Sequence, residues 1–236
     1  ADLYSGIHAK KGLFTGESLF GLPDQTLEKW ESTLNMIAEL RPESIDSFHL
    51  RLQFERGHHP PLYKMFTEGP HRFPDEDTNL LMKIMSYERL RAAGYTAKVT
   101  AHIFTLHSKT DFRMRLIKRR YTLALGTRAR SEISPGRVKN HSLEQYMNLL
   151  GQNTLPIESA VKLTERQLMQ REAVWGLRNY EGLDKTAFKD RFGVEVRNSF
   201  GAIITKFEEL GLVADSGNIV RLTQKGKLLA DEGLFK

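Results

Sequence analysis

The stretch Leu19-Phe20-Gly21-Leu22-Pro23-Asp24-Gln25-Thr26 lies close to the start of the chain. Its apolar residues before Gly21 predict the end of a strand, and Pro23 with Asp24 marks a tight turn. Residues 27–40 then carry apolar side chains at helical spacing, which predicts a helix whose first N–H groups point back at the loop. A strand–loop–helix with a glycine in the loop is a common place to hold a small anionic ligand, although most such turns bind nothing. The apolar positions of the predicted helix are Leu27, Trp30, Leu34, Ile37 and Ala38.

The composition describes an ordinary globular protein of 236 residues, with 40% hydrophobic and 27% charged side chains. This length suits one large domain, or one medium domain and one small domain. The sequence has no apolar run of the roughly 18 to 20 residues that a membrane helix needs, and it opens without a signal peptide. We therefore expect a cytoplasmic protein with no membrane partner.

The chain contains no cysteine. This absence excludes disulfides, thiolate catalysis and cysteine-ligated zinc or iron–sulfur clusters built from this chain alone. The adjacent histidines His58 and His59 are a poor metal site, because neighbouring side chains point in different directions and no third ligand follows at a suitable spacing. We predict no metal site, and no G-x-S-x-G elbow indicates a serine hydrolase.

The net charge is +6 and the isoelectric point is near 9.4, which permits an anionic partner without requiring one. The positive charge is concentrated between residues 109 and 139. Most of these side chains are expected to be solvated, but arginines that face a cleft would suit carboxylates or phosphates. The basic residues are Lys109, Arg113, Arg115, Lys118, Arg119, Arg120, Arg128, Arg130, Arg137 and Lys139.

Strands and helices alternate over the first part of the chain. Residues 47–55 alternate strictly between apolar and polar side chains, which predicts a strand with Phe48 on the apolar face and His49 on the polar face. A long helix is predicted over 74–93, a second alternating strand over 95–105 and a buried strand over 121–126. This order favours an α/β fold with a parallel sheet, and such sheets bind ligands beyond the carboxyl ends of their strands.

Several polar residues would meet at those strand ends. Glu17 precedes Gly21 by four residues, where a carboxylate could accept hydrogen bonds from ribose hydroxyls or form a structural ion pair. His49 and Arg51, on the predicted polar face of a strand, are candidates for a pocket, as is His102. The alternative for both histidines is a hydrogen-bonded structural role, which we favour. Arg128 and Arg130 follow a predicted buried strand and could face a ligand.

The sequence pattern changes after residues 153–163, which we predict to be a linker. Residues 164–236 predict three helices and a hairpin around the turn Asp215-Ser216-Gly217-Asn218, which is the order of a winged helix. A nucleic-acid-binding helix should be basic, but the third helix carries Lys206 against Glu208 and Glu209. We therefore favour a structural role and expect no nucleic-acid partner.

An ordered series of segments resembles the radical S-adenosylmethionine (SAM) proteins of the oxygen-independent coproporphyrinogen III oxidase and haem-utilisation type. The resemblance covers nearly the whole chain, and its specificity comes from the order and spacing of the segments rather than from any single motif. The segments include Phe20-Gly21-Leu22-Pro23-x-Gln25-Thr26, Arg41-Pro42-Glu43-Ser44-Ile45, Phe73-Pro74-Asp75-Glu76-Asp77, Gly94-Tyr95, Ala124-Leu125-Gly126-x-x-Ala129-Arg130-Ser131, Leu177-Arg178, Glu181-Gly182 and Leu222-Thr223-x-Lys225-Gly226.

The resemblance implies that residues 1–152 are the later part of an incomplete parallel (β/α) barrel with a family-specific extension, and that 164–236 are its winged-helix-like domain. The opening strands and the C-x-x-x-C-x-x-C loop that ligates a [4Fe–4S] cluster would lie upstream of Ala1. The intact parent would then be a radical SAM oxidoreductase acting on a tetrapyrrole, with SAM and the cluster as cofactors.

The resemblance also implies site residues, while the catalytic residues stay unknown. The SAM side would include Glu17, Gly21, Leu22 and Gln25, and the substrate side would include His49, Arg51, Arg128 and Arg130. Glu17 stands where the family usually carries Asp, and Arg128 stands where it commonly carries a second glycine. The haem-chaperone pattern of His-Asn followed by Tyr-Trp is not found between His107 and Tyr121, which argues against that branch. The alternative hypothesis is a haem or tetrapyrrole carrier without a cluster.

Overall fold

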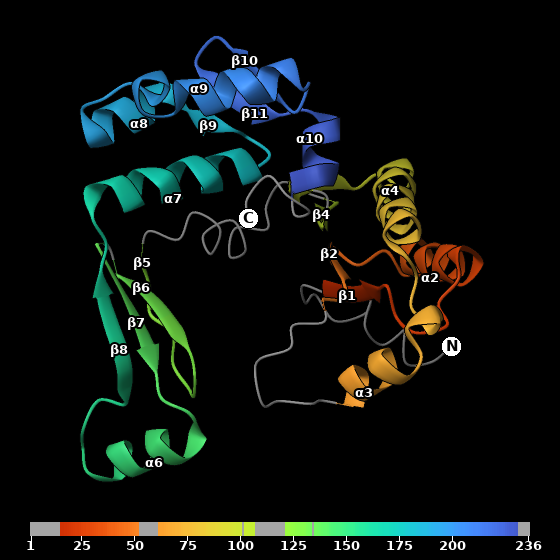
Figure 1. Cartoon of the computed structure of the whole chain (residues 1–236), viewed down its shortest axis with the longest axis horizontal. Helices are drawn as coiled ribbons and strands as arrows, with labels where there is room; N and C mark the ends of the chain where they lie inside the picture. Colours follow the sequence, from red (N-terminus) through yellow and green to blue (C-terminus); the bar gives the residue numbers. More distant parts are fainter. Residues whose placement is uncertain (1–14, 52–60, 101, 107–120, 134, 231–236) are drawn as a thin grey trace. The chain divides into compact units, whose positions relative to one another are not determined.

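The computed structural model describes residues 15–51, 61–100, 102–106, 121–133 and 135–230. The chain forms two compact units (Figure 1). The first comprises Ala1–Thr110 and Gln224–Lys236, and the second comprises Asp111–Thr223.

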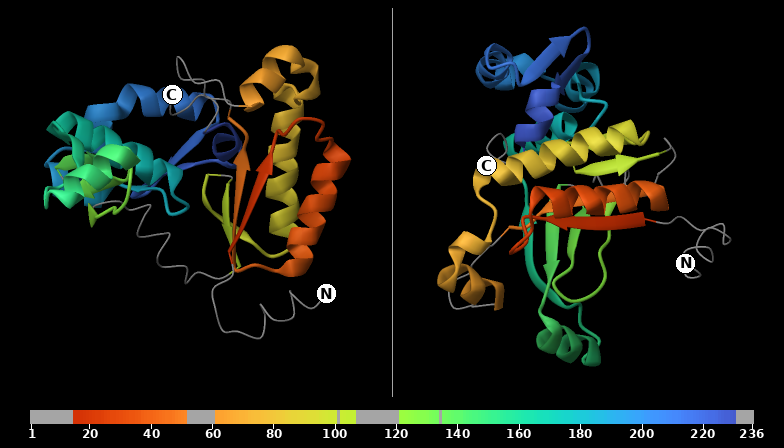
Figure 2. Two further views of the ribbon diagram at one scale, coloured as in Figure 1. Left: turned by 90° about the horizontal axis from the view of Figure 1, so that it is seen from below. Right: turned by 90° about the vertical axis from the view of Figure 1, so that its right-hand side faces the viewer.

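The first unit is built on a four-stranded sheet with the strand order β1-β2-β4-β3. Helices α2 and α4 lie on the same side of this sheet (Figure 2). The strands are β1 (Thr15–Phe20), β2 (Ser44–His49), β3 (Thr96–Val99) and β4 (Ile103–Thr105), and the helices are α2 (Leu27–Leu40), α3 (Pro61–Glu68), η1 (Pro70–Arg72), α4 (Glu76–Ala92) and α10 (Gln224–Leu229).

Among the described strands of this sheet, one pair is parallel. β1 runs parallel to β2 in a regular register from Thr15↔Ser44 to Phe20↔His49, whereas β4 is antiparallel to both β2 and β3. The prediction of a single strand over 95–105 is therefore wrong. The segment turns back on itself at Thr100, whose φ of 44° is left-handed, and forms the hairpin β3–β4. The described residues form a mixed α/β fold without a closed barrel.

The helix-covered face of the sheet carries the hydrophobic core. Ile45 and Phe104 on the strands pack with Trp30 and Leu34 of α2, and all four side chains are fully buried. The indole nitrogen of Trp30 also donates to the Met82 carbonyl of α4 at 2.9 Å, so its buried N–H is satisfied. The predicted amphipathic pattern of residues 27–40 is thus confirmed as the packing face of α2.

Both long helices begin at side-chain caps that the sequence provides. Thr26 accepts a hydrogen bond from the Lys29 amide at the start of α2, and Asp75 accepts one from the Thr78 amide at the start of α4. Hydrogen bonds from the Thr78 side chain and from the Thr78 amide lower the pKa of the Asp75 carboxyl. The caps fix where the helices begin, and therefore where the loops after β1 and before α4 meet.

The second unit contains two antiparallel sheets, with the strand orders β5-β6-β7-β8 and β10-β11-β9. Helix α7 begins with a capping box between Thr164 and Gln167. The strands of the second unit are β5 (Tyr121–Thr122), β6 (Arg130–Ile133), β7 (Gly136–Asn140), β8 (Ile157–Lys162), β9 (Leu183–Asp184), β10 (Val213–Ser216) and β11 (Ile219–Leu222). The helices of this unit are α6 (Leu143–Gly151), α7 (Glu165–Arg178), α8 (Lys185–Phe192) and α9 (Val196–Glu209).

Two features of this unit differ from the sequence-based expectations. The predicted buried strand over 121–126 is wrong, because β5 covers only two residues and Leu123 and Leu125 are 74% and 82% exposed. Most of the predicted linker 153–163 is strand β8, which pairs with β7. The predicted hairpin around residues 215–218 is confirmed as β10–β11. The domain boundaries drawn from the sequence stay a prediction.

Candidate functional site

The loop after β1 is held in shape by its own side chains. Gly21 has a φ of +83°, a conformation that a residue with a side chain adopts only with strain. The side-chain oxygen of Gln25 accepts the Leu22 amide at 3.2 Å, and its nitrogen donates to the Leu19 carbonyl at 3.4 Å. Gln25 therefore bridges both sides of Gly21 and stabilises the turn.

The far side of the same loop is tied to the segment before α4. The Asp24 amide donates to the Arg72 carbonyl at 2.7 Å, and the Arg72 guanidinium forms an ion pair with the Asp24 carboxylate. The hydrogen bond from Arg72 lowers the pKa of Asp24 and raises that of the guanidinium. Asp24 also adopts a left-handed φ of 58°, a conformation that is rare outside glycine. The hydrogen bond and ion pair between Asp24 and Arg72, which we call the clamp, stabilise this conformation.

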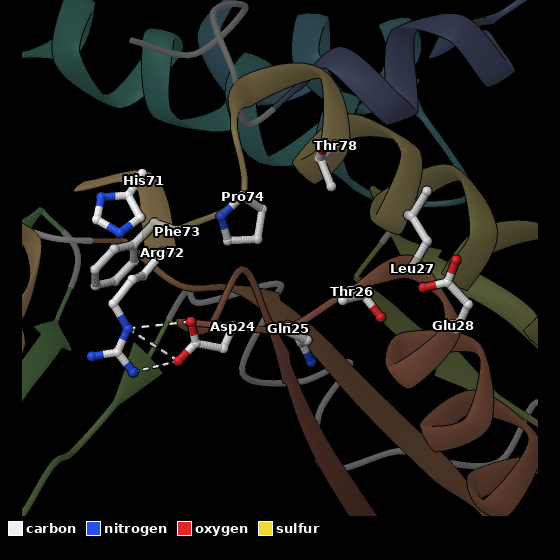
Figure 3. A pocket seen from close by; sticks show the side chains of 10 residues that line it. All are labelled: Asp24, Gln25, Thr26, Leu27, Glu28, His71, Arg72, Phe73, Pro74 and Thr78. Carbon is white, nitrogen blue, oxygen red and sulfur yellow. Dashed lines mark hydrogen bonds and ion pairs between the residues drawn. The ribbon is translucent and has the colours of Figure 1, made fainter. Parts of the chain in front are cut away.

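An open hollow of about 660 Å³ lies beside this clamp. Figure 3 shows the Arg72 guanidinium directed at Asp24 from one wall, while Thr26 and Glu28 of the α2 end line another. Both signs of charge are present, and a side chain caps one backbone amide at each of the two nearby helix ends. The hollow is lined by Asp24, Gln25, Thr26, Leu27, Glu28, His71, Arg72, Phe73, Pro74 and Thr78.

His49, at the carboxyl end of β2, lies on the helix-covered face of the sheet. Its ring stacks on Phe20, with 5.2 Å between centroids and 10° between planes, and Phe20 in turn packs against Trp30. Gly21 approaches this ring and Asn79 of α4 closely. These contacts form a compact polar cluster behind the turn.

The opposite face of the sheet is open only along β1 and at the end of β2, because Ser44, Asp46 and Thr105 on the same face are buried. Glu17 and Leu19 alternate with the buried Ser18 and Phe20 along β1, so both point to this face. In the parallel register Leu19 lies beside Phe48, and these large apolar side chains are 39% and 42% exposed. Exposed apolar side chains such as Leu19 and Phe48, next to a carboxylate such as Glu17, are typical of a surface that binds a partly apolar ligand.

A histidine lies at the edge of this open face. The His102 ring is 5.7 Å from that of Phe48, and its Nδ1 is 2.5 Å from the Thr100 hydroxyl. The His102 carbonyl also accepts the Ser47 amide at 2.7 Å, which fixes the turn between β3 and β4 against β2. The hydrogen bond to Nδ1 orients the ring.

The structure brings together some of the sequence-predicted site residues. Glu17 lies on the open face of β1, and Gly21, Leu22 and Gln25 form the loop directly after it. Arg51 is exposed, two residues beyond the end of β2. The predicted strand faces are wrong, because Phe48 is on the open face and His49 is on the core face.

Arg128 and Arg130 belong to the second unit, so their membership of the same site stays a prediction. Both side chains are exposed. Arg128 has a left-handed φ of 56°, and its amide donates to the His141 carbonyl at 2.8 Å. An arginine therefore occupies a backbone conformation that favours glycine, at the position where the resemblance predicts one.

Sequence reasoning missed Asn79 and Arg72. Asn79 lies inside the periodic pattern of α4 and carries no motif, so no local signal could have found it. Arg72 was detectable only as a basic residue two positions before Pro74. Both residues reach the loop through tertiary contacts that a one-dimensional pattern does not encode.

Among the residues that the structure describes, no group of three or more His, Cys, Asp or Glu side chains could hold a metal ion. The pair His58-His59 lies outside the described residues. Over the same described parts of the chain, no helix has the length and apolar character needed to cross a membrane.

Comparison with known proteins shows similarity to one class, described by a family model and a solved structure. The family described as the HemN C-terminal domain matches residues 163–229. The fold is similar to a solved structure described as coproporphyrinogen III oxidase (HemN) from Escherichia coli, a radical SAM enzyme. The TM-score is 0.76 at 18% identity, over 98% of this chain and 56% of that one.

Two curated relatives narrow the assignment. The chain is 22% identical to heme chaperone HemW of Bacillus subtilis over 96% of its length, and 22% identical to an oxygen-independent coproporphyrinogen III oxidase of Helicobacter pylori over 89%. The chain is therefore similar to HemN- and HemW-type proteins along most of its length, and residues 163–229 match the HemN C-terminal domain. One of these relatives is a haem chaperone, although this chain lacks the His-Asn and Tyr-Trp pattern. The absence of that pattern therefore does not distinguish the haem-chaperone branch from the oxidase branch.

The chain spans about half to three-fifths of the length of these relatives: 62% of the chaperone and 49% of the oxidase. Of the two implied cofactors, SAM fits the residues of this chain better than the [4Fe–4S] cluster does. The exposed Glu17 could hold SAM, whereas a chain without cysteine offers no thiolate to an iron–sulfur cluster. The missing side chain of Gly21 leaves room for His49 and Asn79.

Proposed function

We propose that this chain is the C-terminal part of a radical SAM oxidoreductase that acts on a tetrapyrrole, in the manner of the oxygen-independent coproporphyrinogen III oxidases. The observation that carries the proposal is the similarity to HemN- and HemW-type proteins along nearly the whole chain. The β1–Gly21–α2 loop supports it, because it joins a parallel strand to a helix at the strand's carboxyl end.

On the cofactor side, three residues of this chain have distinct roles in the proposal. Glu17 accepts hydrogen bonds from the ribose hydroxyls of SAM on the open face of the sheet. Gly21 lies in the turn that faces the cofactor, and Gln25 holds that turn through its bonds to Leu22 and Leu19. Bound SAM supplies the radical chemistry, while the protein orients it and excludes competing reactions.

The [4Fe–4S] cluster does not fit the residues of this chain, which has no cysteine. In the proposal its ligands come from outside these 236 residues, on an earlier part of the barrel. No chemical step is assigned to this chain through the cluster.

On the substrate side, Arg51, Arg128 and Arg130 bind the carboxylates of a tetrapyrrole. Arginine suits this role because its planar guanidinium holds a carboxylate through two parallel hydrogen bonds. We leave His49 out of this group, because its ring lies on the helix-covered face against Phe20.

The remaining parts of the proposal concern the two domains of the chain and its place in the cell. Residues 1–152 would form the barrel part and 164–236 a winged-helix-like domain in a cytoplasmic protein. The domain is structural rather than nucleic-acid-binding in this proposal. Its basic residue Arg197, at the start of α9, is paired with Asp215 and Glu208 at 2.6 and 2.9 Å.

Equilibrium dialysis of the full chain with SAM tests the cofactor side. We expect Glu17→Gln to weaken SAM binding at least fivefold, because a ribose contact to a charged acceptor is worth about 1.5 kcal/mol or more. The matched control is Glu39→Gln, an exposed acid on α2. Equal affinities of the two variants would contradict the assignment of Glu17.

Anaerobic reconstitution with iron and sulfide tests the missing cluster. We expect this polypeptide alone to show neither cluster absorbance nor 5′-deoxyadenosine formation from SAM. Both signals together would contradict the proposal that the cluster ligands lie elsewhere.

A second candidate is a haem or tetrapyrrole carrier without a cluster. The exposed apolar pair of Leu19 and Phe48 next to the His102 ring favours it, because a flat macrocycle could lie on this surface. Haem titration is the test. A Soret shift that His102→Ala abolishes and His71→Ala retains would support the carrier, and a spectrum that neither variant changes would exclude His102 as a ligand.

A further inference from the structure

Two cationic side chains lie next to each other on one face of the sheet β5-β6-β7-β8. Arg130 of β6 is paired directly with Lys139 of β7, and side chains paired in this way point to the same face. Like charges in such a position destabilise a sheet. The Arg130 side chain is exposed, and it forms no hydrogen bond or ion pair with the residues that the structure describes. This face therefore carries positive charge that Arg130 does not share with an acid.

The acid next to Arg130 on the same face is already occupied. Glu132 follows Arg130 by two residues along β6, so both side chains point the same way. Glu132 is buried and accepts hydrogen bonds from Arg171 of α7 and Arg137 of β7. Its charge is therefore used by those two cations and does not neutralise Arg130.

An irregularity of β8 brings one carboxylate to this face. The register shifts between the pairs Lys139↔Ser159 and Asn140↔Ile157, so Glu158 is an extra residue of β8. In a regular strand Glu158 would point away from the face of Ser159 and Lys139. Instead, its Oε1 is 2.8 Å from Lys139 Nζ. The bulge thus turns the Glu158 carboxylate toward Lys139, and this contact shows that a carboxylate fits beside the lysine.

Two more basic residues lie near this carboxylate. The Arg128 amide donates to the His141 carbonyl at 2.8 Å, which holds the two residues together. The hydrogen bond from Lys139 lowers the pKa of Glu158, and the charges of Lys139, His141 and Arg128 lower it further. All three basic groups therefore lie within electrostatic reach of one carboxylate, and they outnumber it.

We propose that Arg128, Arg130 and Lys139 form a site for the carboxylates of an organic polyacid, and that Glu158 occupies the Lys139 position until a ligand carboxylate displaces it. Arginine holds a carboxylate through two parallel hydrogen bonds, and lysine binds one as a point charge. Lys139 and Glu158 are new members of the site beside the two arginines of the proposed function. That the polyacid is a tetrapyrrole rests on the proposed function.

Titration of the full chain with coproporphyrin I, a tetracarboxylate, followed by porphyrin fluorescence, tests the cations. We expect Arg130→Gln to weaken binding about fivefold, the upper range for an exposed ion pair. The matched control is Lys162→Gln, which removes the same charge from the other face of β8 and should leave the affinity unchanged. Equal losses in the two variants would mean a general charge effect and would overturn the site.

The role of Glu158 predicts a gain rather than a loss. Glu158→Gln removes the internal competitor and should tighten binding about threefold, whereas Glu209→Gln, an exposed acid at the end of α9, should not. In a Lys139→Gln background the gain should disappear, because no lysine is left to release. The displacement is wrong if Glu158→Gln fails to tighten binding, or if the gain persists without Lys139.

Citrate, measured by calorimetry on the same variants, separates this site from the proposed function. If citrate shows the mutational pattern while the porphyrin does not bind, the polyacid site stands and the tetrapyrrole substrate fails. If the porphyrin binds equally to all variants, the tetrapyrrole stands and this site is wrong. If the wild-type chain binds neither probe, the site is overturned, and dialysis with SAM still tests the cofactor side of the proposed function.

Discussion

The sheet β1-β2-β4-β3 and the sheet β5-β6-β7-β8 are stabilised in different ways. In the first, one face is covered by α2 and α4, and fully buried side chains such as Ile45 and Phe104 fill the layer between them. In the second, every residue of the edge strand β8 is exposed, and so are Leu123 and Leu125 beside β5. Among the residues that the structure describes, the first sheet therefore has an apolar core and the second has none.

The buried positions of the second sheet are polar instead. Ser131 and Glu132 on β6 are buried, and Glu132 accepts hydrogen bonds from Arg171 of α7 at 2.5 Å and from Arg137 of β7 at 3.2 Å. The hydroxyl of Ser131 accepts the Ala124 amide at 3.0 Å. Hydrogen bonds and a charge network thus replace packing, which means that the two sheets should respond differently to the same kind of change.

The largest contrast is expected for loss of an apolar side chain. Phe104→Ala should lower the free energy of unfolding of the first unit by about 3–5 kcal/mol, because it removes a fully buried ring and leaves a cavity. The matched variant Leu125→Ala should change the second unit by less than about 0.5 kcal/mol, since the side chain is exposed.

The two tryptophans make this comparison measurable, because Trp30 lies in the first unit and Trp175 in the second. Urea unfolding followed by fluorescence in a Trp175→Phe background reports the first unit, and a Trp30→Phe background reports the second. Equal losses for Phe104→Ala and Leu125→Ala would remove the distinction between the sheets.

Charge is expected to matter most in the second sheet. Burial lowers the pKa of the Arg171 guanidinium, although Glu132 opposes this shift, and the two side chains are only about 10% exposed. Glu132→Leu leaves the Arg171 charge without its main partner and should cost about 2–4 kcal/mol in urea unfolding. The double variant Glu132→Leu with Arg171→Met should regain most of that loss. A double variant as unstable as the single one would show that packing, not charge, holds this position.

The sequence predicted the elements that have strong local signals. Helix α2 followed from its apolar spacing, and the β10–β11 hairpin followed from its turn residues. The resemblance also located the Gly21 loop, and the structure adds the contacts that hold it.

The sequence could not predict which face of a strand is buried. Alternation distinguishes two faces, but Phe48 is half exposed and His49 packs on Phe20, because register and neighbouring helices decide the direction. The same limit applies to residues 121–126, where an apolar run is exposed, and to Asn79, whose contact with Gly21 is tertiary.

Alkaline pH should affect the first unit through Tyr95. Its hydroxyl is buried and donates to the Pro42 carbonyl at 2.7 Å, and burial raises its pKa to about 12. A raised pKa in the folded state means that the stabilisation is complete below pH 10 and is lost as the pH rises toward 12. We expect a loss of up to about 2 kcal/mol over this range. Unfolding curves of Tyr95→Phe should lack this dependence, and an unchanged slope would contradict the assignment.

The smallest effect is expected for the exposed pair of Glu158 on β8 and Lys139 on β7, which are 2.8 Å apart in the second sheet. The hydrogen bond from Lys139 lowers the pKa of Glu158. Because the pKa of Glu158 is lower in the folded chain, the carboxylate stabilises the fold above its pKa in the unfolded chain. This stabilisation is lost as the pH falls through the pKa of the folded chain. Glu158→Gln should therefore lower the melting temperature only slightly at pH 7, and 1 M salt should remove most of this difference.

The control for this pair is Glu144→Gln, an exposed acid on α6. The Glu158→Gln difference should also disappear in acid, where the wild-type carboxylate is protonated. A large loss at pH 7 that persists in high salt would mean that Glu158 is desolvated, and hence that β8 is covered in solution. That result would break the contrast between the sheets, because the exposed edge of the second sheet would then be packed against another surface.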